Sequence, residues 1–508
     1  MSNSKRNFEV IIVGAGISGA ALAYELARYT DVKSIAIIEK YEDVATLNSK
    51  ATSNSQTIHV GDIETNYTLE KAAITKRTAK MVERYCLQHH LQDKAIFSHQ
   101  KMALGVGEDE VEFLLHRYEE FSELFPYLEV WDKEKLKEKE PKLVWDENGI
   151  ERPEPIVGIG ASGEWTTVDY GILAKDMIER AKQEPDTEVE LFLNTEVENI
   201  ERSGKRGYKV LTKGETFYAD FVVANAGAHS LFLAHKMGHG HNLGCLPIAG
   251  SFYLTNEKIL NGKVYMIQNP KLPFAALHGD PDVLVDGNTR FGPTALVLPK
   301  LERFKPGTYL DFWKTLRFDS KIAKALWKLL KESDIRNYIL RNFMFEVPVL
   351  NKWLFLRDAR KIVPSLQKEQ FSYAKGFGGV RPQVINKDEE KLMLGEASIN
   401  TGEGLIFNMT PSPGATSCLG NAERDLRFIV AYLGKDFDEE RFKGELTEGE
   451  YCVLPEPVAT QKENVNRIRD AIRRTHEEYF TDLHQGKPDA SFWDKPHSKN
   501  VGETKKKS

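Results

Sequence analysis

A glycine-rich turn near the N-terminus has the residue types and spacing of a dinucleotide-binding site. Gly14, Gly16 and Gly19 follow the apolar run at residues 8–13 and open the helical composition of Ile17–Tyr29. The first glycine permits a tight turn, the second lets a pyrophosphate approach the backbone, and the third lets the helix pack closely on the strand. Free N–H groups at the start of the helix then face the phosphates. The sequence therefore predicts a site for a phosphate-linked dinucleotide.

A carboxylate stands where the ribose of that ligand would lie. A second apolar run, residues 34–39, ends in Glu39, twenty residues after Gly19. A carboxylate at this point accepts hydrogen bonds from an adenosine ribose and repels a 2′-phosphate. Because strand, helix, second strand and acidic end are all present, a glycine-rich turn in an unrelated α/β protein is the weaker interpretation.

Three later segments favour FAD over NAD. The polar loop 53–57 follows the second strand, where its side chains can reach a pyrophosphate and a flavin ring. Residues 222–227 resemble the strand and glycine with which split flavoproteins return to the dinucleotide domain. Residues 410–416 precede a helix expected from about Ala415 to Leu433, whose N-terminal N–H groups would stabilise an anionic reduced flavin. An NAD enzyme needs no second glycine-rich segment so late in the chain.

The predicted cofactor-binding residues come from these segments and from single positions elsewhere. They are Gly14, Ala15, Gly16, Ser18, Gly19, Glu39, Lys40, Ser53, Asn54, Ser55, Gln56, Thr57, Val197, Ala226, Gly227, Gly379, Arg381, Gly414, Ala415 and Thr416. No metal is expected. His235, His239 and His241 are separated by glycines and have no acidic or thiolate neighbour, so a solvated loop is the favoured interpretation.

Composition and charge narrow the class of protein. The chain has 508 residues, 41% hydrophobic and 28% charged, with a net charge of −6. These values are ordinary for a globular protein of two domains and argue against a nucleic-acid-binding protein. Four widely spaced cysteines without a CxxC pair favour a reducing compartment, here the cytoplasm. Neither a signal peptide nor a membrane-spanning apolar run is expected, so any membrane contact would be peripheral.

Several motifs together resemble the malate:quinone oxidoreductases, in the form of ε-proteobacterial members rather than the type with longer loops. The resemblance covers about residues 8 to 445, and the chain beyond about Tyr451 departs from the family pattern. The residues that carry it are 54–67, 268–274, 278–281, 290–295, 380–383 and 407–416.

The resemblance implies an FAD enzyme attached peripherally to the cytoplasmic face of the cell membrane. Such an enzyme oxidises (S)-malate to oxaloacetate and passes the electrons to ubiquinone or menaquinone, which links the tricarboxylic acid cycle to the respiratory chain. The wider superfamily includes L-2-hydroxyglutarate oxidoreductases, so a related 2-hydroxy-acid dehydrogenase or oxidase stays open. A flavin-binding protein without turnover is the alternative from another class.

The expected fold is α/β, with two domains. One is a split, Rossmann-like FAD-binding domain of the glutathione-reductase and D-amino-acid-oxidase kind, formed by residues 1–80, 156–245 and 370–445. The other is an α+β substrate domain on a mainly antiparallel sheet, formed by residues 81–155 and 246–369. Residues 446–508 are predicted to be a weakly ordered tail with a helix near 464–480. Residues 108–140 and 301–341 are predicted to be helical.

Oxidation of a 2-hydroxy acid needs a base for the hydroxyl proton and cations for the carboxylates. His278 is the favoured base and His59 the second choice, because imidazole titrates near neutral pH. Either histidine could instead hydrogen-bond the flavin or the backbone. Arg381 is the predicted carboxylate anchor, since its fork binds a carboxylate bidentately, and a structural ion pair is the alternative. Further predicted substrate contacts are Arg290, Tyr253 and Thr294.

Residues 301–340 carry apolar side chains interleaved with Lys and Arg. This pattern is compatible with an interfacial membrane surface. It is more often found in an amphipathic helix packed on its own domain.

Overall fold

The structure is a computed structural model that describes residues 6–204, 207–268, 277–284, 288–346, 350–393, 395–448 and 461–482. The chain divides into two compact units, Met1–Thr460 and Gln461–Ser508. In the second unit the described residues form helix α13 (Lys462–Asp482), which confirms the helix predicted over 464–480. The rest of the predicted tail beyond residue 448 lies outside the described residues.

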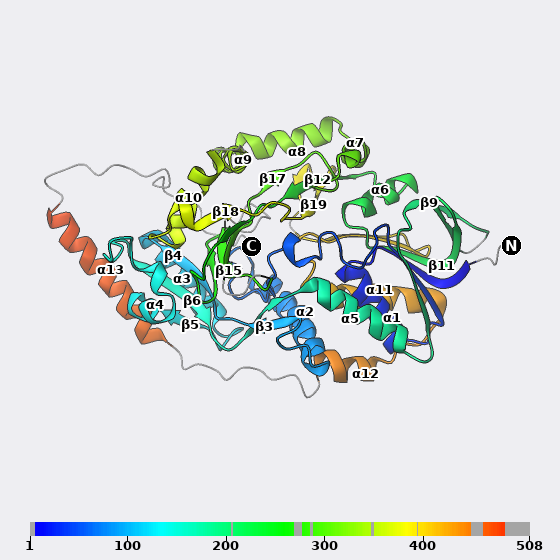
Figure 1. The fold of residues 1–508 in the computed structure, drawn as a ribbon, viewed down its shortest axis with the longest axis horizontal. Coiled ribbons are helices and arrows are strands. Elements are labelled where there is room, and N and C mark those ends of the chain that lie inside the picture. Colours follow the sequence, from blue (N-terminus) through cyan, green and yellow to red (C-terminus); the bar gives the residue numbers. More distant parts are fainter. Residues whose placement is uncertain are drawn as a thin grey trace, which may run out of the picture. The chain divides into compact units, whose positions relative to one another are not determined.

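The dinucleotide-binding elements form an eight-stranded sheet in the first unit (Figure 1). Its main path runs β21-β22-β11-β1-β2-β8, and β10 and β9 continue from β11. All pairs from β22 to β8 are parallel. The strands are β1 (Arg6–Val13), β2 (Ser34–Ile38), β8 (Glu188–Phe192), β9 (Val197–Arg202), β10 (Tyr208–Thr212), β11 (Thr216–Ala224), β21 (Ala397–Asn400) and β22 (Leu405–Met409).

The second half of β1, Val10–Val13, is entirely apolar because both faces of the sheet are covered there. Ile11 and Val13 belong to a core on one face, and the alternate residues Val10 and Ile12 are buried as well. Helix α1 (Ile17–Tyr29) packs between α5 (Tyr170–Gln183) and α11 (Cys418–Leu433). The predicted strand–helix–strand unit is therefore confirmed, with α1 at the predicted bounds.

A second eight-stranded sheet runs in the order β18-β13-β16-β15-β14-β4-β6-β5. Among the described strand pairs of this sheet only β4 and β14 are parallel, so the expectation of a mainly antiparallel sheet is confirmed. The strands are β4 (Lys101–Val106), β5 (Glu129–Trp131), β6 (Ile156–Ala161), β13 (Tyr253–Thr255), β14 (Lys263–Met266), β15 (His278–Pro281), β16 (Thr289–Gly292) and β18 (Phe371–Tyr373).

The described residues form two further, smaller antiparallel sheets. The order of the larger one is β17-β12-β19-β20, and in it Ile248 of β12 pairs with Arg381 of β19. The strands are β12 (Leu243–Ala249), β17 (Leu296–Val297), β19 (Val380–Asn386) and β20 (Lys391–Leu392), and in the other sheet β3 (Ile96–Ser98) and β7 (Trp165–Val168).

The remaining helices belong to the first unit, and α7, α8 and α9 follow one another in a row at the top of Figure 1. They are α2 (Leu69–Gln88), α3 (Glu108–Phe121), α4 (Lys133–Lys139), α6 (Ala228–Lys236), α7 (Tyr309–Leu316), α8 (Ser320–Lys331), α9 (Ser333–Met344), α10 (Leu350–Ile362) and α12 (Glu439–Phe442). Short helical turns occupy Ala51–Ser53, Pro141–Leu143, Pro306–Thr308, Lys368–Gln370 and Lys443–Thr447. Within the described residues, no helix is both long and apolar enough to span a membrane.

The helix predicted over 108–140 is wrong in its middle part, because β5 interrupts it. Trp131 of β5 pairs with Gly158 and packs against Gly160, where a Cβ would lie 2.9 Å from the indole ring. Sheet pairing with a distant glycine-rich strand therefore outweighs the local helical composition.

Sheet membership departs from the predicted domain segments at two places. Strand β6 lies in the second sheet and β7 pairs with β3, although both fall within residues 156–245, which were assigned to the FAD-binding domain. Strands β18, β19 and β20 also pair outside the first sheet, although they fall within 370–445. The cause is pairing between residues far apart in sequence, such as β6 with β4 and β19 with β12.

Candidate active site

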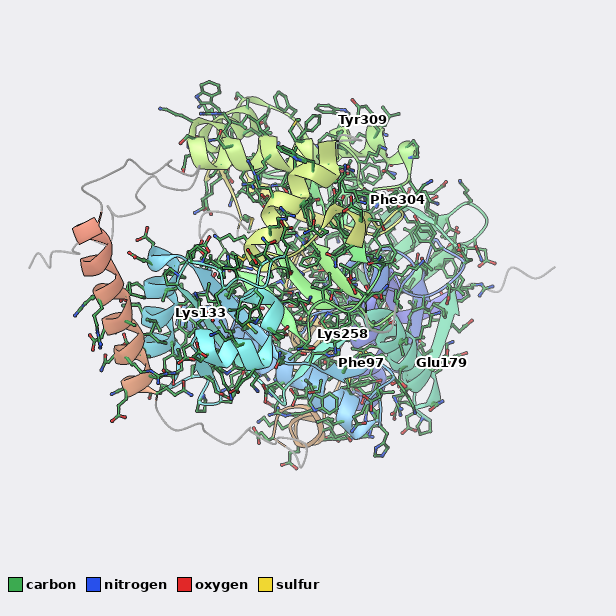
Figure 2. All side chains as sticks on the ribbon, turned by 60° about the vertical axis from the view of Figure 1, so that its left-hand side comes forward. Phe97, Lys133, Glu179, Lys258, Phe304 and Tyr309 are labelled. Atoms are coloured by element: carbon green, nitrogen blue, oxygen red, sulfur yellow. The ribbon has the colours of Figure 1, made fainter. Side chains whose placement is uncertain are left out.

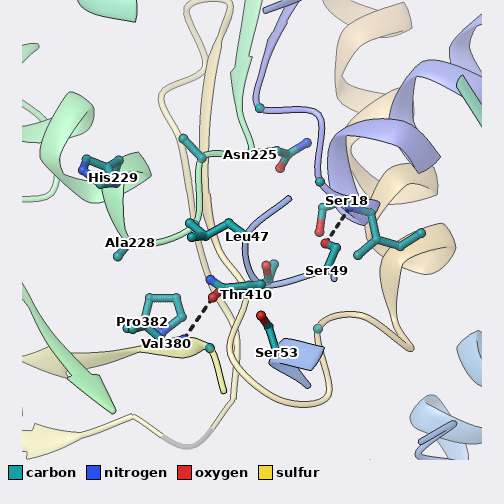
Figure 3. A pocket seen from close by; sticks show the side chains of 18 of the residues that line it. Ser18, Leu47, Ser49, Ser53, Asn225, Ala228, His229, Val380, Pro382 and Thr410 are labelled. Atoms are coloured by element: carbon teal, nitrogen blue, oxygen red, sulfur yellow. Dashed lines mark hydrogen bonds between the residues drawn. The ribbon is translucent and has the colours of Figure 1, made fainter. Parts of the chain in front are cut away.

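A pocket of about 610 Å³ lies where the parallel strands of the first sheet end. It is lined by the chain that follows β1, β2, β11 and β22, and by the start of β19 (Figure 3). Ligands of doubly wound sheets bind at the carboxyl ends of parallel strands, and the volume is within the range of cofactor pockets. Of the predicted cofactor-binding residues, all except Ala15, Gly19 and Gln56 line this pocket.

The glycine turn after β1 has the geometry that its sequence predicts. Gly14 has φ +107°, and a Cβ there would lie 2.5 Å from the carbonyl oxygen of Asn225. A Cβ on Gly19 would lie 2.0 Å from the carbonyl oxygen of Gly14. Helix α1 therefore rests directly on the turn, which explains why Gly19 acts through packing and does not line the pocket.

The first residues of α1 face the pocket. Gly16, Ile17 and Ser18 line it. Gly16 stands at the N-cap position and has no side chain that could cap the helix. The N–H of Ile17 donates to the Ser49 hydroxyl at 3.0 Å (Figure 3). The positive end of the helix dipole is thus directed at a space suited to a phosphate.

Glu39 is oriented by two backbone N–H groups. Ala15 donates to one carboxylate oxygen at 2.8 Å and Tyr41 to the other at 3.1 Å. Burial raises the pKa of Glu39, and these two hydrogen bonds act in the opposite direction. Each oxygen keeps acceptor capacity, as a ribose hydroxyl would require. Ala15 therefore acts on Glu39 instead of lining the pocket.

At the next part of the pocket wall, the backbone at residues 379–380 lies in close contact with the loop that follows β2. The Val380 N–H donates to the Asn48 side-chain oxygen at 3.0 Å (Figure 3). A Cβ on Gly379 would lie 2.7 Å from that oxygen and 2.7 Å from the carbonyl oxygen of Ser53. Only glycine fits here, and this contact brings the start of β19 to the loop after β2.

Gln56 points away from the pocket. Its side-chain amide donates to the Ala51 carbonyl at 3.1 Å, and its carbonyl oxygen accepts from the Val283 N–H at 3.1 Å. The side chain is fully buried. Gln56 thus holds two loops together, whereas its neighbours Ser53, Asn54, Ser55 and Thr57 line the pocket.

The late glycine-containing segment reaches the pocket through a turn. The N–H of Gly414 donates to the Pro411 carbonyl at 2.6 Å and the N–H of Thr416 to the Pro413 carbonyl at 2.8 Å. Because of this turn, α11 begins at Cys418 instead of Ala415. The expectation that the N-terminal N–H groups of this helix face the flavin stays a prediction, and Gly414, Ala415 and Thr416 of the turn just before the helix line the pocket.

His59 lines the pocket with an oriented imidazole. Its Nδ1 lies 2.7 Å from Glu64 Oε1, and the other oxygen of Glu64 accepts from the Gly61 N–H at 2.8 Å. Since an ionised carboxylate can only accept, the proton of the neutral imidazole lies on Nδ1, and Nε2 is the ring nitrogen with the lone pair, 3.4 Å from the Ser55 hydroxyl oxygen. The backbone N–H of His59 donates to the Thr416 hydroxyl at 3.1 Å, which ties the histidine to the late segment.

Arg381 also lines the pocket, and its charge has no protein counter-ion among the described residues. Its Nη1 atom is buried without a hydrogen-bond partner. Burial lowers the pKa of the guanidinium, and the nearby Tyr338 and Tyr265 raise it in part. Because Arg381 is partly buried at the pocket wall and has no carboxylate partner among the described residues, a bound anion would stabilise its charge. The pocket thus brings together an oriented imidazole, a glycine turn at the start of a helix and a guanidinium without a protein carboxylate among the described residues.

Over residues 6–477 the chain matches the family model described as malate:quinone oxidoreductase. The chain belongs to the malate:quinone oxidoreductase family. A probable malate:quinone oxidoreductase of Campylobacter jejuni is 56% identical over 447 residues, 87% of this chain and 100% of that protein. The malate:quinone oxidoreductase of Helicobacter pylori is 48% identical over 444 residues, 87% of this chain and 98% of that protein. These relatives agree with the predicted ε-proteobacterial form, and the family match extends past the predicted limit near residue 445.

The fold is shared with solved oxidoreductase structures. L-α-glycerophosphate oxidase of Mycoplasma pneumoniae, solved with FAD bound, has a TM-score of 0.59 at 20% identity, covering 84% of this chain and 95% of that chain. Glycine oxidase of Geobacillus kaustophilus has a TM-score of 0.58 at 18% identity, covering 87% of this chain and 99% of that chain. The expected fold class is thereby confirmed.

In this family member the other predicted base, His278, lies behind the pocket wall. It is fully buried on β15 and stacks on Tyr265, with ring centroids 4.1 Å apart. Its Nε2 lies 3.6 Å from Asp280. Burial alone would raise the pKa of Asp280, but Lys263, His278 and Arg290 hold it below its ordinary value. His278 is thus part of a buried charge cluster and does not line the pocket.

Arg290 belongs to the same cluster. It is fully buried, with Nη1 3.2 Å from Asp282 and Nε 3.7 Å from Asp280. Its guanidinium also lies 4.6 Å from the centre of the Phe252 ring. The structure therefore separates the two predicted carboxylate anchors: Arg381 lines the pocket, whereas Arg290 is engaged by protein carboxylates.

Tyr253 and Thr294 do not line the pocket either. Tyr253 stacks on Phe355, with ring centroids 3.9 Å apart, in the core against the second sheet. The Thr294 hydroxyl accepts from the Ser251 N–H at 2.9 Å and is almost fully buried. The predicted hydroxyl contacts with substrate thus fall on residues that the fold uses for packing.

Sequence reasoning missed several residues that shape the pocket. Ser49 caps α1, Asn48 joins two loops, and Asn225 approaches Gly14. The signal for Ser49 and Asn48 was present, since both precede the polar loop already singled out. Glu64, which orients His59, lies within the motif 54–67 that carried the family resemblance.

Proposed function

We propose that this pocket binds FAD and that the chain oxidises (S)-malate to oxaloacetate there, passing the electrons to a membrane quinone. Membership of the malate:quinone oxidoreductase family supports the substrate and the acceptor. One structural observation supports the chemistry. A partly buried guanidinium, Arg381, without a carboxylate partner among the described residues, and an oriented imidazole, His59, line the same pocket. This reaction joins the tricarboxylic acid cycle to the respiratory chain.

The residues present fit FAD. The start of α1 suits the pyrophosphate, and Glu39 suits the adenosine ribose. Glycine is required at Gly14 and Gly379, because a Cβ there would lie 2.5 and 2.7 Å from neighbouring oxygen atoms. When bound, FAD supplies the two-electron acceptor for substrate carbon C2.

Arg381 is the proposed carboxylate anchor. Its planar fork can bind one malate carboxylate by two hydrogen bonds, and its burial strengthens that interaction relative to water. Binding an anion also compensates the cost of the buried guanidinium. The substrate would then be held with C2 in a fixed position, which is the condition for fast transfer.

His59 is the proposed base. With Nδ1 donating to Glu64, Nε2 is the nitrogen that can take the hydroxyl proton of malate. The Glu64 carboxylate also stabilises the imidazolium that forms when His59 accepts this proton. We favour His59 over His278 because His59 lines the pocket, whereas His278 is fully buried on β15 and does not line it.

The proposed location is the inner face of the cell membrane, with peripheral contact to lipid. A quinone with an isoprenoid tail, ubiquinone or menaquinone, resides in the bilayer, so the enzyme must meet it there. Peripheral attachment is compatible with the lack of a membrane-spanning helix among the described residues.

Anaerobic reduction of the bound flavin by a panel of 2-hydroxy acids tests the proposal. We expect (S)-malate to bleach the flavin, and L-2-hydroxyglutarate, L-lactate and amino acids to do so far more slowly. Fast bleaching by L-2-hydroxyglutarate would favour the related dehydrogenase instead. A yellow protein that no member of the panel reduces would indicate a flavin-binding protein without turnover.

The variants His59→Gln and His278→Gln separate the two bases. We expect the first to slow flavin reduction by about 10²-fold or more, the usual contribution of a general base. The second should change the reduction rate much less. The reverse ranking would assign the base to His278.

A further inference from the structure

Exposed apolar side chains are concentrated on one group of helices. Among the described residues between 304 and 353, ten large apolar side chains are exposed, including Trp327 at 69% and Trp353 at 60%. We call this set the α7–α10 face. Its members are Phe304, Tyr309, Leu310, Trp313, Phe318, Trp327, Leu330, Leu340, Phe343 and Trp353. Such a concentration marks an interaction surface.

These helices do not need the exposed residues for their own packing. Helix α7 buries Phe312 and Leu316 and leaves Leu310 and Trp313 exposed. Helix α8 buries Ile322 and Ala325. An amphipathic helix packed on its own domain has one apolar stripe, directed inward. Here a second apolar set points outward, so inward packing does not account for it.

Figure 2 shows side chains projecting outward from this group of helices, and it labels Phe304 and Tyr309 in this part of the molecule. The residue types are those of a lipid interface, because Trp and Tyr gather at the headgroup level of membranes.

The same region is basic, whereas the chain as a whole is acidic. Residues 304–353 contain ten Lys and Arg against five Asp and Glu, and the net charge of the chain is −6. Lys321 and Lys328 of α8 are paired with Asp388 and Glu390. Exposed Arg317, Lys331 and Arg336 contribute further positive charge. A basic surface with large apolar side chains is complementary to an anionic bilayer.

The α7–α10 face adjoins the pocket. Asp311 and Lys314 of α7 line the pocket, and Trp313 between them is 45% exposed. Helix α7 therefore borders the pocket and contributes to the exposed face. A bilayer at this face would bring a lipid-soluble acceptor close to the pocket.

We propose that the α7–α10 face docks on the surface of a bilayer that contains anionic lipids, with its aromatic side chains inserted at the headgroup level. This rests on the proposed use of a membrane quinone. Apolar insertion provides the attachment, and the basic side chains favour anionic headgroups.

Vesicle binding by the full-length holoenzyme tests this docking surface. The vesicles are phosphatidylcholine alone, or phosphatidylcholine with phosphatidylglycerol. We expect binding to the anionic vesicles that weakens with added salt. The variant Trp313→Ser/Trp327→Ser/Trp353→Ser should bind at least about tenfold more weakly.

The matched control is Phe113→Ser/Ile150→Ser/Phe428→Ser, which removes three exposed apolar side chains outside the α7–α10 face. It should bind as wild type does. The variant Arg317→Gln/Lys331→Gln/Arg336→Gln should lose about fivefold per charge on anionic vesicles. Flavin content and flavin reduction by malate should be unchanged in every variant.

The proposal is overturned if the tryptophan variant binds vesicles as wild type does, or if the control loses as much binding. It is also overturned if wild type binds no vesicles and is a dimer that the tryptophan variant dissociates, since the face would then be an interface between copies. Failure of malate to reduce the flavin would refute the proposed function and leave the vesicle comparison intact.

Discussion

Replacing Glu64 with Gln tests whether an oriented His59 is the base. In the wild-type structure Glu64 accepts from two donors, His59 Nδ1 at 2.7 Å and the Gly61 N–H at 2.8 Å. A glutamine has the same shape but only one acceptor oxygen, and its other end is a donor. One of the two donors must therefore lose its partner, or the imidazole must move its proton to Nε2.

The magnitude follows from these contacts. Leaving one buried donor unpaired costs about 1–3 kcal/mol of stability. A proton on Nε2 would remove the lone pair that takes the substrate proton, and general-base catalysis contributes about 10²–10⁴ in rate. We therefore expect flavin reduction at saturating malate to slow by about 10²-fold or more, with a change in the apparent Kd for malate of less than about threefold.

Anaerobic stopped-flow measurement of flavin absorbance against malate concentration provides the assay. The control is Glu83→Gln, which changes a buried glutamate that pairs with Lys80 outside the pocket. It should lower stability without slowing flavin reduction. A Glu64→Gln enzyme that reduces its flavin within about threefold of the wild-type rate would refute the role of Glu64 in orienting a catalytic base.

Three further outcomes follow from the structure. Arg381→Ala should raise KM for malate by about 10- to 100-fold, because it removes a charge-assisted hydrogen bond to the substrate. Initial rates measured against malate concentration would show an unchanged KM if the anchor lies elsewhere. Gly14→Ala should purify with little flavin, because its Cβ would lie 2.5 Å from Asn225 O and φ is +107°; a normal flavin-to-protein ratio would contradict this geometry. Burial, together with the nearby Glu423 and Asp425, raises the pKa of Glu25 well above 4.5 in the folded state. The folded protein therefore holds a proton that the unfolded chain releases. Between the two pKa values, the free energy of unfolding of the wild type should fall by up to about 1.4 kcal/mol for each pH unit of increase. Glu25→Gln does not titrate, so urea unfolding should show its stability relative to wild type increasing from about pH 5 to about pH 8, and a pH-independent difference would argue against this burial effect.

The sequence by itself determined the features that depend on local stereochemistry. Gly14 and Gly19 could be assigned because a positive φ and a close helix contact exclude other residues. Helix α1 was predicted at its observed bounds, and Glu39 was predicted at the end of the second strand. These features depend on a few neighbouring residues, so their spacing alone was sufficient.

Tertiary structure decided which of several chemically equivalent side chains reaches the pocket. His278 and His59 are both imidazoles, yet stacking on Tyr265 buries the first, and Glu64 holds the second in the pocket wall. Arg290 and Arg381 are both guanidiniums, but Asp280 and Asp282 engage only the first.

Pairing between distant strands determined these positions. Residue Ile248 of β12 pairs with Arg381 and sets its place beside the pocket, and His278 of β15 pairs with Gly292 of β16. Burial and ion pairing depend on partners far away in the chain, which residue type and local spacing do not specify. For that reason most of the pocket-lining residues could be predicted from sequence, whereas which histidine and which arginine reach the pocket depended on the fold.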